Sequence, residues 1–276
     1  MSYKHISVEP LTPTIGATIR DVDLTQPLDD TVFEEIHQAW MDHLVIFFRD
    51  QSITPETHLE LGKMFGPLHI HPAAPYANDN PELMVIRTDE NSHRNNGNGW
   101  HSDVSADEEP PMASILHIHH IPSQGGDTLF SNMYAAFEAL SDPMQNFLDD
   151  LTALHSADYT GQYGDHKPQR DFPQAIHPVV RTHPITMRKA LFVNGGFTKR
   201  IEGLTSTESR QLLDFLFEHI KNPNFQCRFQ WEEQSIAIWD NRCVQHMAVW
   251  DYFPETRSGL RVTVTGDKPF NSNHTE

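Results

Sequence analysis

The chain of 276 residues has only two cysteines, Cys227 and Cys243, and no apolar run long enough to cross a membrane. Two cysteines do not make a disulfide framework, and a bilayer span needs about 18 consecutive apolar residues. The first residues, MSYKHISVEPLTP, contain neither the apolar segment nor the cleavage site of a secretory signal. We therefore expect a cytoplasmic protein whose two thiols are buried.

Basic residues are also scarce. The sequence has 20 Lys and Arg against 38 Asp and Glu, which gives a formal net charge of −18 at pH 7. A nucleic-acid partner requires a basic surface for its phosphates, so this class of partner is excluded. The same field repels any small anionic ligand, so such a ligand would have to be held by local arginines.

The chain contains no internal repeat, low-complexity tract or flexible linker, and its length fits one domain spanning residues 1–276. Helical patterns and capping residues predict helices at residues 29–43, from Thr54 to Met64, near Met133, from Ser141, and from the Thr205 capping box. Short apolar runs predict strands at residues 44–50, 83–87, 114–121, 127–130, 179–182, 190–194, 225–231, 235–240 and 260–266. This pattern favours a mainly β sandwich or jelly-roll barrel with helical insertions.

Residues 159–175, YTGQYGDHKPQRDFPQA, show no periodicity. A loop of this length within a compact domain is usually an active-site lid or a disordered insert. We favour the lid, although polarity alone fits both.

Three His-x-acid pairs are candidates for part of a metal site: His101/Asp103, His58/Glu60 and His274/Glu276. Residues two apart point to nearly opposite sides of a helix but share one face of a strand. The second pair lies in a predicted helix and the third in a polar tail, so only His101 and Asp103 can turn inward together. Of the remaining histidine-rich runs, HIHH at 117–120 is interpreted as a polar strand face, and His69 and His71 lie in a proline-rich loop suited to function.

A site of two histidines and one carboxylate with open positions is typical of non-haem Fe(II) oxygenases. The pair His101 and Asp103 needs a third ligand from a late strand, and His246 in WDNRCVQH is well placed. Arg257 and Arg261 follow it in RSGLRVTVTGDKPF, where they supply local positive charge.

The motifs WHSDV, GGDT, HPVVRTHP, ALFVNGGF, WDNRCVQH and RSGLRVTVTGDKPF occur in this order between residues 100 and 270. This ordered set resembles the taurine dioxygenase family, the Fe(II)- and 2-oxoglutarate-dependent oxygenases that include alkylsulfatase and aryloxyalkanoate dioxygenases. The resemblance begins at residue 15 and covers nearly the whole chain. It implies a double-stranded β-helix, or jelly-roll, core, and a homo-oligomer, either a dimer or a tetramer.

The resemblance also assigns residues to roles. His101, Asp103 and His246 match the iron ligands, and Thr128 and Arg257 match the residues that hold the distal carboxylate of 2-oxoglutarate. A guanidinium pairs with a carboxylate through two charge-assisted hydrogen bonds, and a hydroxyl can add a third. Trp239 is expected either as a wall near the iron or as a core residue. Residues 240–242 are interpreted as an internal polar network that positions the strand of His246.

The substrate residues match the family less completely. Taurine-specific members hold the sulfonate with a histidine, a tyrosine, an asparagine and an arginine. Here His71 and Arg261 are retained, Asn98 is a candidate for the asparagine, and Ala74 stands at the tyrosine position. Ala106 replaces a further aromatic residue. We therefore expect an anion that is larger or more apolar than taurine.

The predicted function is hydroxylation of a sulfonate, alkyl sulfate or carboxylate by O2 and 2-oxoglutarate at Fe(II), with release of succinate and CO2 and cleavage of a C–S or C–O bond. A taurine dioxygenase proper is the alternative within the family. A zinc hydrolase with the same ligands does not account for Arg257 and Thr128. A non-catalytic, metal-binding jelly roll is the alternative from another class.

Overall fold

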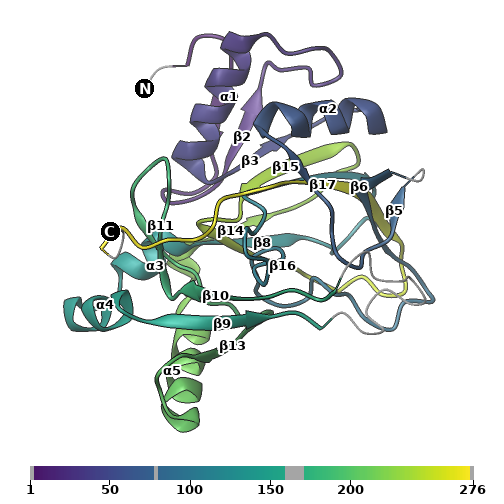
Figure 1. Cartoon of the computed structure of the whole chain (residues 1–276). Helices are drawn as coiled ribbons and strands as arrows, with labels where there is room; N and C mark the ends of the chain where they lie inside the picture. Colours follow the sequence, from purple (N-terminus) through teal and green to yellow (C-terminus); the bar gives the residue numbers. More distant parts are fainter. Residues whose placement is uncertain (1–2, 78–79, 159–170, 274–276) are drawn as a thin grey trace.

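The computed structural model describes residues 3–77, 80–158 and 171–273 (Figure 1). Most of the segment predicted as a lid, residues 159–170, lies outside the described residues, as do His274 and Glu276. The last residues of the predicted loop, from Gln174, already belong to a strand. In the described part, no helix combines the length and the apolar character that a membrane span requires.

A large mixed sheet forms the centre of the described structure, with strand order β1-β2-β3-β15-β7-β17-β6-β5 and with β4 paired to β17. Its strands are β1 (Ser7–Pro10), β2 (Ala17–Arg20), β3 (Val45–Phe48), β4 (Leu68–His69), β5 (Tyr76–Ala77), β6 (Asn80–Thr88), β7 (Ala113–His120), β15 (Ser235–Asp240) and β17 (Arg257–Val264). Most of its pairs are antiparallel, and β2 and β3 are parallel. Sequence-distant segments therefore become neighbours in this sheet.

Three smaller sheets complete the β structure of the described residues. The first has the order β14-β8-β16, from Gln226–Phe229, Thr128–Asn132 and Val244–Ala248. The second has the order β10-β9-β13, from Gln174–Pro178, Thr152–Ser156 and Thr198–Ile201. The third pairs β11 (Val180–Thr182) with β12 (Lys189–Leu191).

The helices begin where the sequence predicts. They are α1 (Asp30–His43), α2 (Pro55–Phe65), α3 (Met133–Glu138), α4 (Asp142–Asp149) and α5 (Ser206–His219), with a 3-10 turn at Pro223–Phe225. The side chains of Asp29 and Thr54 accept hydrogen bonds from the first turns of α1 and α2, and Thr205 forms the expected capping box with Glu208. Ser141 precedes α4 without a side-chain capping bond.

The central strands are apolar on both faces because the large sheet is covered on both sides. Ile46 and Ile238 point into a core shared with Trp40 of α1, while Phe47 and Trp239 belong to a second core shared with the β14-β8-β16 sheet. Figure 1 shows α1 and α2 on one side of the large sheet and β8 and β16 on the other. Alternation along a strand thus assigns neighbouring residues to two different cores.

Several fully buried histidines make the stability of this fold sensitive to acid. Burial lowers the pKa of His58, His71 and His155 to about 3, whereas unfolded histidine titrates near 6.5. Their contribution to stability is therefore present above pH 6.5 and is lost as the pH falls toward the folded pKa values.

Between pH 6.5 and 5 the unfolded chain takes up protons that the folded chain does not bind, so the free energy of unfolding must decrease as the pH falls. We expect a loss of more than about 1.4 kcal/mol per pH unit, which corresponds to more than one proton. Urea unfolding at several pH values measures this slope, and H58Q should reduce it. A slope below one proton would contradict the neutral, buried state of these histidines.

Candidate metal centre

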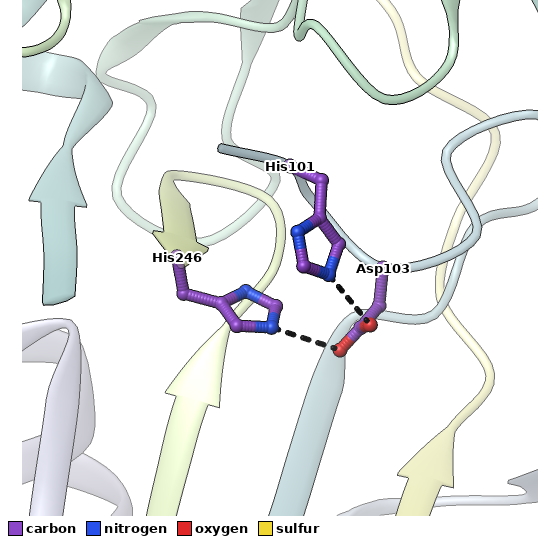
Figure 2. A group of neighbouring side chains, drawn as sticks. All are labelled: His101, Asp103 and His246. Carbon is purple, nitrogen blue, oxygen red and sulfur yellow. Dashed lines mark ion pairs between the residues drawn. The ribbon is translucent and has the colours of Figure 1, made fainter. Parts of the chain in front are cut away.

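Figure 2 shows that His101, Asp103 and His246 point toward one another. One candidate ligand atom from each of these side chains lies within 4.8 Å of the others. His101 Nε2 is 3.7 Å from Asp103 Oδ1, and His246 Nε2 is 3.9 Å from Asp103 Oδ2. The structure thus brings together the three residues that the sequence predicts as ligands.

A backbone bridge creates this cluster. His101 N donates to His246 O at 3.1 Å, and His246 N donates to His101 O at 2.9 Å. His246 lies in β16, and its register partner in β8 is Phe130. The loop that carries His101 and Asp103 is therefore attached to the edge of the small sheet, opposite the histidine of β16.

The two imidazoles are oriented in different ways. The Gly99 carbonyl accepts a hydrogen bond from His101 Nδ1 at 2.7 Å, which leaves the Nε2 lone pair of His101 facing Asp103. His246 lies between rings, with centroids 4.7 Å from Trp239 and 6.1 Å from Phe130. Burial, assisted by His101, holds the pKa of His246 well below its usual value. The neutral imidazole that a metal requires is therefore the stable form.

The third side chain is an ionised carboxylate. Burial alone would raise the pKa of Asp103, but Arg261, His246 and His101 together outweigh it, and the pKa lies well below its usual value. Arg261 donates to Oδ1 and the Ser114 hydroxyl donates to Oδ2, both at 2.7 Å. The structure therefore offers two imidazole nitrogens and one anionic oxygen donor, a set that suits a ferrous ion and leaves coordination positions open.

A cavity of about 760 Å³ adjoins these three residues. At one place its wall contains Arg257, which is buried and donates from Nε to the Gly126 carbonyl at 3.1 Å. Its second terminal nitrogen, Nη2, has no hydrogen-bond partner among the described residues. Because leaving a buried guanidinium half-paired is costly, this part of the cavity fits an anionic ligand such as a carboxylate.

Thr128 lies in the same cavity wall. Its Oγ1 accepts a hydrogen bond from the Trp231 indole at 2.9 Å. Since an indole N–H can only donate, the hydroxyl proton of Thr128 remains available for another acceptor. Arg257 and Thr128 can thus both donate to one bound anion, as the sequence predicts for 2-oxoglutarate.

The glycines of the GGDT motif place these donors. Gly125 and Gly126 have φ of +82° and +75°, and a Cβ on Gly125 would lie 2.5 Å from Asp251 Oδ1. Gly126 N donates to that same carboxylate at 2.8 Å. The left-handed backbone therefore fixes the loop so that the Gly126 carbonyl meets Arg257.

Two of the predicted substrate residues, His71 and Arg261, line the cavity. His71 Nδ1 accepts from Ala73 N and Ala74 N at 3.1 and 2.9 Å, so its proton is on Nε2. Burial, together with the positive charge of Arg261, lowers the pKa of His71 to about 3. His71 can therefore serve as a neutral donor to an anion.

The other predicted substrate residues lie elsewhere. Asn98, Ala74 and Ala106 are not among the described residues that form the cavity wall. Ala106 is completely buried and packs in a small cluster with Ala73 and Ala157. Trp239 does line the cavity, next to His246.

A second group with metal-ligating atoms, His183, Asp240 and Cys243, is also compact. Arg242 donates to both Asp240 oxygens at 2.8 and 2.7 Å, and His183 Nε2 lies 3.0 Å from Oδ2. A guanidinium in this position leaves no room for a cation. This group is the polar network that the sequence predicts for residues 240–242.

The sequence did not predict that Arg261 and Ser114 contact Asp103. The only available signal was the alternation of polar residues along the strands that carry them, β17 and β7.

The fold and the site together define a jelly-roll protein with a compact cluster of two histidines and one carboxylate. The family described as "Taurine catabolism dioxygenase TauD, TfdA family" matches residues 7–263, and the chain belongs to this family. It is thus a 2-oxoglutarate-dependent dioxygenase, and the predicted family, fold class and enzyme class are confirmed.

Individual relatives agree with this. The chain is 36% identical over 280 residues to an alpha-ketoglutarate-dependent sulfate ester dioxygenase of Pseudomonas putida, covering 96% of this chain and 91% of the relative. It is 35% identical over 282 residues to an alpha-ketoglutarate-dependent sulfonate dioxygenase of Saccharomyces cerevisiae, covering 96% and 68%. The solved structure of a taurine dioxygenase from Burkholderia xenovorans is 36% identical, with a TM-score of 0.88 over 99% of this chain and 95% of that one.

The metal centre can be tested without any substrate. H101A and H246A should each abolish tight binding of Mn(II), because each removes one of three ligands, while circular dichroism should show a folded chain. Isothermal titration with Mn(II) alone measures the affinity. H119A removes a histidine outside the cavity and should bind Mn(II) like the wild type. Unchanged Mn(II) affinity in H101A or H246A would remove that residue from the site.

Proposed function

We propose that this dioxygenase hydroxylates a small organic anion, such as a sulfonate, an alkyl sulfate or a carboxylate, at a carbon close to the metal centre. The observation that carries the proposal is the half-paired, buried Arg257 in the same cavity as His101, Asp103 and His246. In this proposal one cavity combines a metal site with a separate carboxylate site, which is what a metal-dependent enzyme with an acidic cosubstrate needs.

In this proposal His101, Asp103 and His246 hold Fe(II), and Arg257 and Thr128 hold the distal carboxylate of 2-oxoglutarate. The bound iron, 2-oxoglutarate and O2 supply the oxidising chemistry, with succinate and CO2 as products. The contribution of the protein is to hold the substrate in the right place relative to the metal. Its buried donors hold the substrate carbon near the metal, and holding reactants in place can supply several kcal/mol of the barrier reduction.

The primary substrate is proposed to bind with its anionic group near His71 and Arg261. Nε2–H of His71 is a neutral donor, and Nε of Arg261 is buried with no hydrogen-bond partner among the described residues. The cavity wall also contains Met84, Ile86 and Leu116, which suit an apolar group. Relatives named for sulfonates and sulfate esters support this choice of head group. Hydroxylation of the carbon that bears the heteroatom would release that group by cleaving a C–S or C–O bond.

A taurine dioxygenase proper is the second candidate, favoured by the similarity to the solved taurine dioxygenase. The size of the cavity and its apolar wall favour a bulkier anion. A zinc hydrolase would have no use for Arg257, and a non-catalytic protein would not need to preserve all three ligands. Both alternatives therefore have less support.

We also propose a cytoplasmic homo-oligomer. The two cysteines are unpaired and buried, which suits a reducing compartment. Phe147, Ile176 and Phe253 are each about half exposed, so they are candidates for a contact between subunits. Light scattering of the purified chain measures the oligomeric state.

R257A should raise the 2-oxoglutarate concentration needed for half-maximal succinate release. A hydrogen bond to a charged group contributes roughly 1.5–3 kcal/mol, which corresponds to about one to two decades in affinity. The requirement for the primary substrate should change much less, because that group binds at His71 and Arg261. R200A, on the exposed face of β13, is the control. An unchanged 2-oxoglutarate requirement in R257A would move the cosubstrate site to another cation.

A screen of succinate release tests the substrate class. Taurine, longer alkyl sulfonates, alkyl sulfates and aryloxy acids are compared at matched concentrations with Fe(II) and 2-oxoglutarate. We expect kcat/KM for the best apolar anion to exceed that for taurine by about tenfold or more, because each buried methylene group is worth about 1–3 kcal/mol. A preference for taurine over every larger anion would favour the second candidate. No substrate-dependent succinate release from any of these anions would count against the proposed substrate class.

A further inference from the structure

The turn that follows β15 carries an amide that contacts the metal-binding segment. Asn241 is buried, and its Oδ1 accepts from Trp239 Nε1 at 3.0 Å and from Asp103 N at 3.2 Å. Its Nδ2 donates to Ser114 Oγ at 2.9 Å. Ser114 Oγ in turn donates to Asp103 Oδ2 at 2.7 Å. One side chain thus contacts both the backbone of Asp103 and, through a hydroxyl, its carboxylate.

The direction of each hydrogen bond in this chain is fixed by chemistry. An indole N–H and a backbone N–H can only donate, so the atom of Asn241 that faces Trp239 and Asp103 must be the oxygen. The amide nitrogen therefore faces Ser114. Since Ser114 Oγ accepts from this nitrogen, its own proton is directed to the Asp103 carboxylate, which can only accept. No alternative amide orientation satisfies all four contacts.

The backbone of Asn241 is itself held in place. Asn241 N donates to Met112 O at 2.8 Å, and Ser102 Oγ donates to Asn241 O at 2.7 Å. The adjacent Asp240 is fixed by Arg242 and His183. The amide is therefore presented from a rigid turn, and rigid support is what keeps a ligand within the narrow geometry that a metal requires.

We propose that Asn241 is a positioning residue for two of the three metal ligands. Through Ser114 it fixes Oδ2 of Asp103, while Arg261 fixes Oδ1 from the other side. Through the indole N–H it fixes Trp239, whose ring packs against His246. His246 depends on this packing because its Nδ1 has no hydrogen-bond partner in the described part of the chain. The proposal rests on the proposed metal centre and assigns a role to a residue that does not touch the metal.

The experiment measures metal affinity in the purified full chain by titration with Mn(II) alone, so it does not depend on turnover. N241A and S114A should each weaken Mn(II) binding about 10–100-fold, the usual effect of removing a residue that orients a metal ligand. W239F removes the indole donor but keeps an aromatic ring beside His246, so it should cause a smaller loss than N241A. S114T keeps the hydroxyl and should restore affinity relative to S114A.

N132A is the matched control for a general loss of stability. Asn132 is a buried asparagine that caps α3 by accepting from Tyr134 N and Ala135 N and has no contact with Asp103. N132A should lower the unfolding temperature and leave Mn(II) affinity within about twofold of the wild type. The 2-oxoglutarate requirement of N241A, measured at saturating Fe(II), should stay near the wild-type value because Arg257 and Thr128 lie on other elements.

The outcomes separate the two proposals. Wild-type Mn(II) affinity in both N241A and S114A, or a loss no larger than that of N132A, would overturn the positioning role and leave the metal centre intact. Equal loss in S114T and S114A would also contradict it, because the hydroxyl would then not matter. No Mn(II) binding by the wild type would instead overturn the metal centre itself, and the positioning role with it.

Discussion

The buried carboxylate of Asp103 is the constraint around which the site is built. A carboxylate with 3% of its surface exposed cannot remain ionised without partners. In this chain β17 supplies the charge of Arg261, and β7 supplies the hydroxyl of Ser114. Both strands lie in the large sheet, whereas the histidine that faces the carboxylate, His246, lies in the small one. The packing of the two sheets against each other therefore determines whether the Asp103 carboxylate can act as a ligand.

Because the protein is strongly acidic overall, the local arrangement of its arginines says more about ligand binding than its net charge does. With a net charge of −18, the surface repels the acidic molecules that the cavity is proposed to bind. Within the cavity, the positive charges of Arg257 and Arg261 offset this repulsion. Each side chain is buried with at least one nitrogen atom that lacks a hydrogen-bond partner in the described residues. Burial lowers the pKa of Arg257, yet a guanidinium stays charged at any physiological pH. The cavity thus remains positive inside an acidic molecule.

Local signals in the sequence predicted the helices and the central strands well. Thr54 and Thr205 mark helix starts by their own chemistry, and residues 45–48 and 236–239 are continuously apolar because each face meets a core. Short mixed strands such as β9 and β13 were not predicted, because their stability comes from pairing rather than from their own residues. The ordered motifs identified the candidate ligands. They could not show that Ala106 packs against Ala73 and Ala157 or that Asn241 contacts Asp103, since both facts depend on contacts between distant segments.

The bridge between His101 and His246 joins segments that are far apart in the chain: the His101 loop, whose Asp103 contacts β7 and β17 of the large sheet, and β16 of the small sheet. A metal ion bound by His101, Asp103 and His246 would link these two segments. A ligand that binds only the folded state stabilises that state by mass action. Binding of the metal would then add to the free energy of unfolding as well as supply the chemistry.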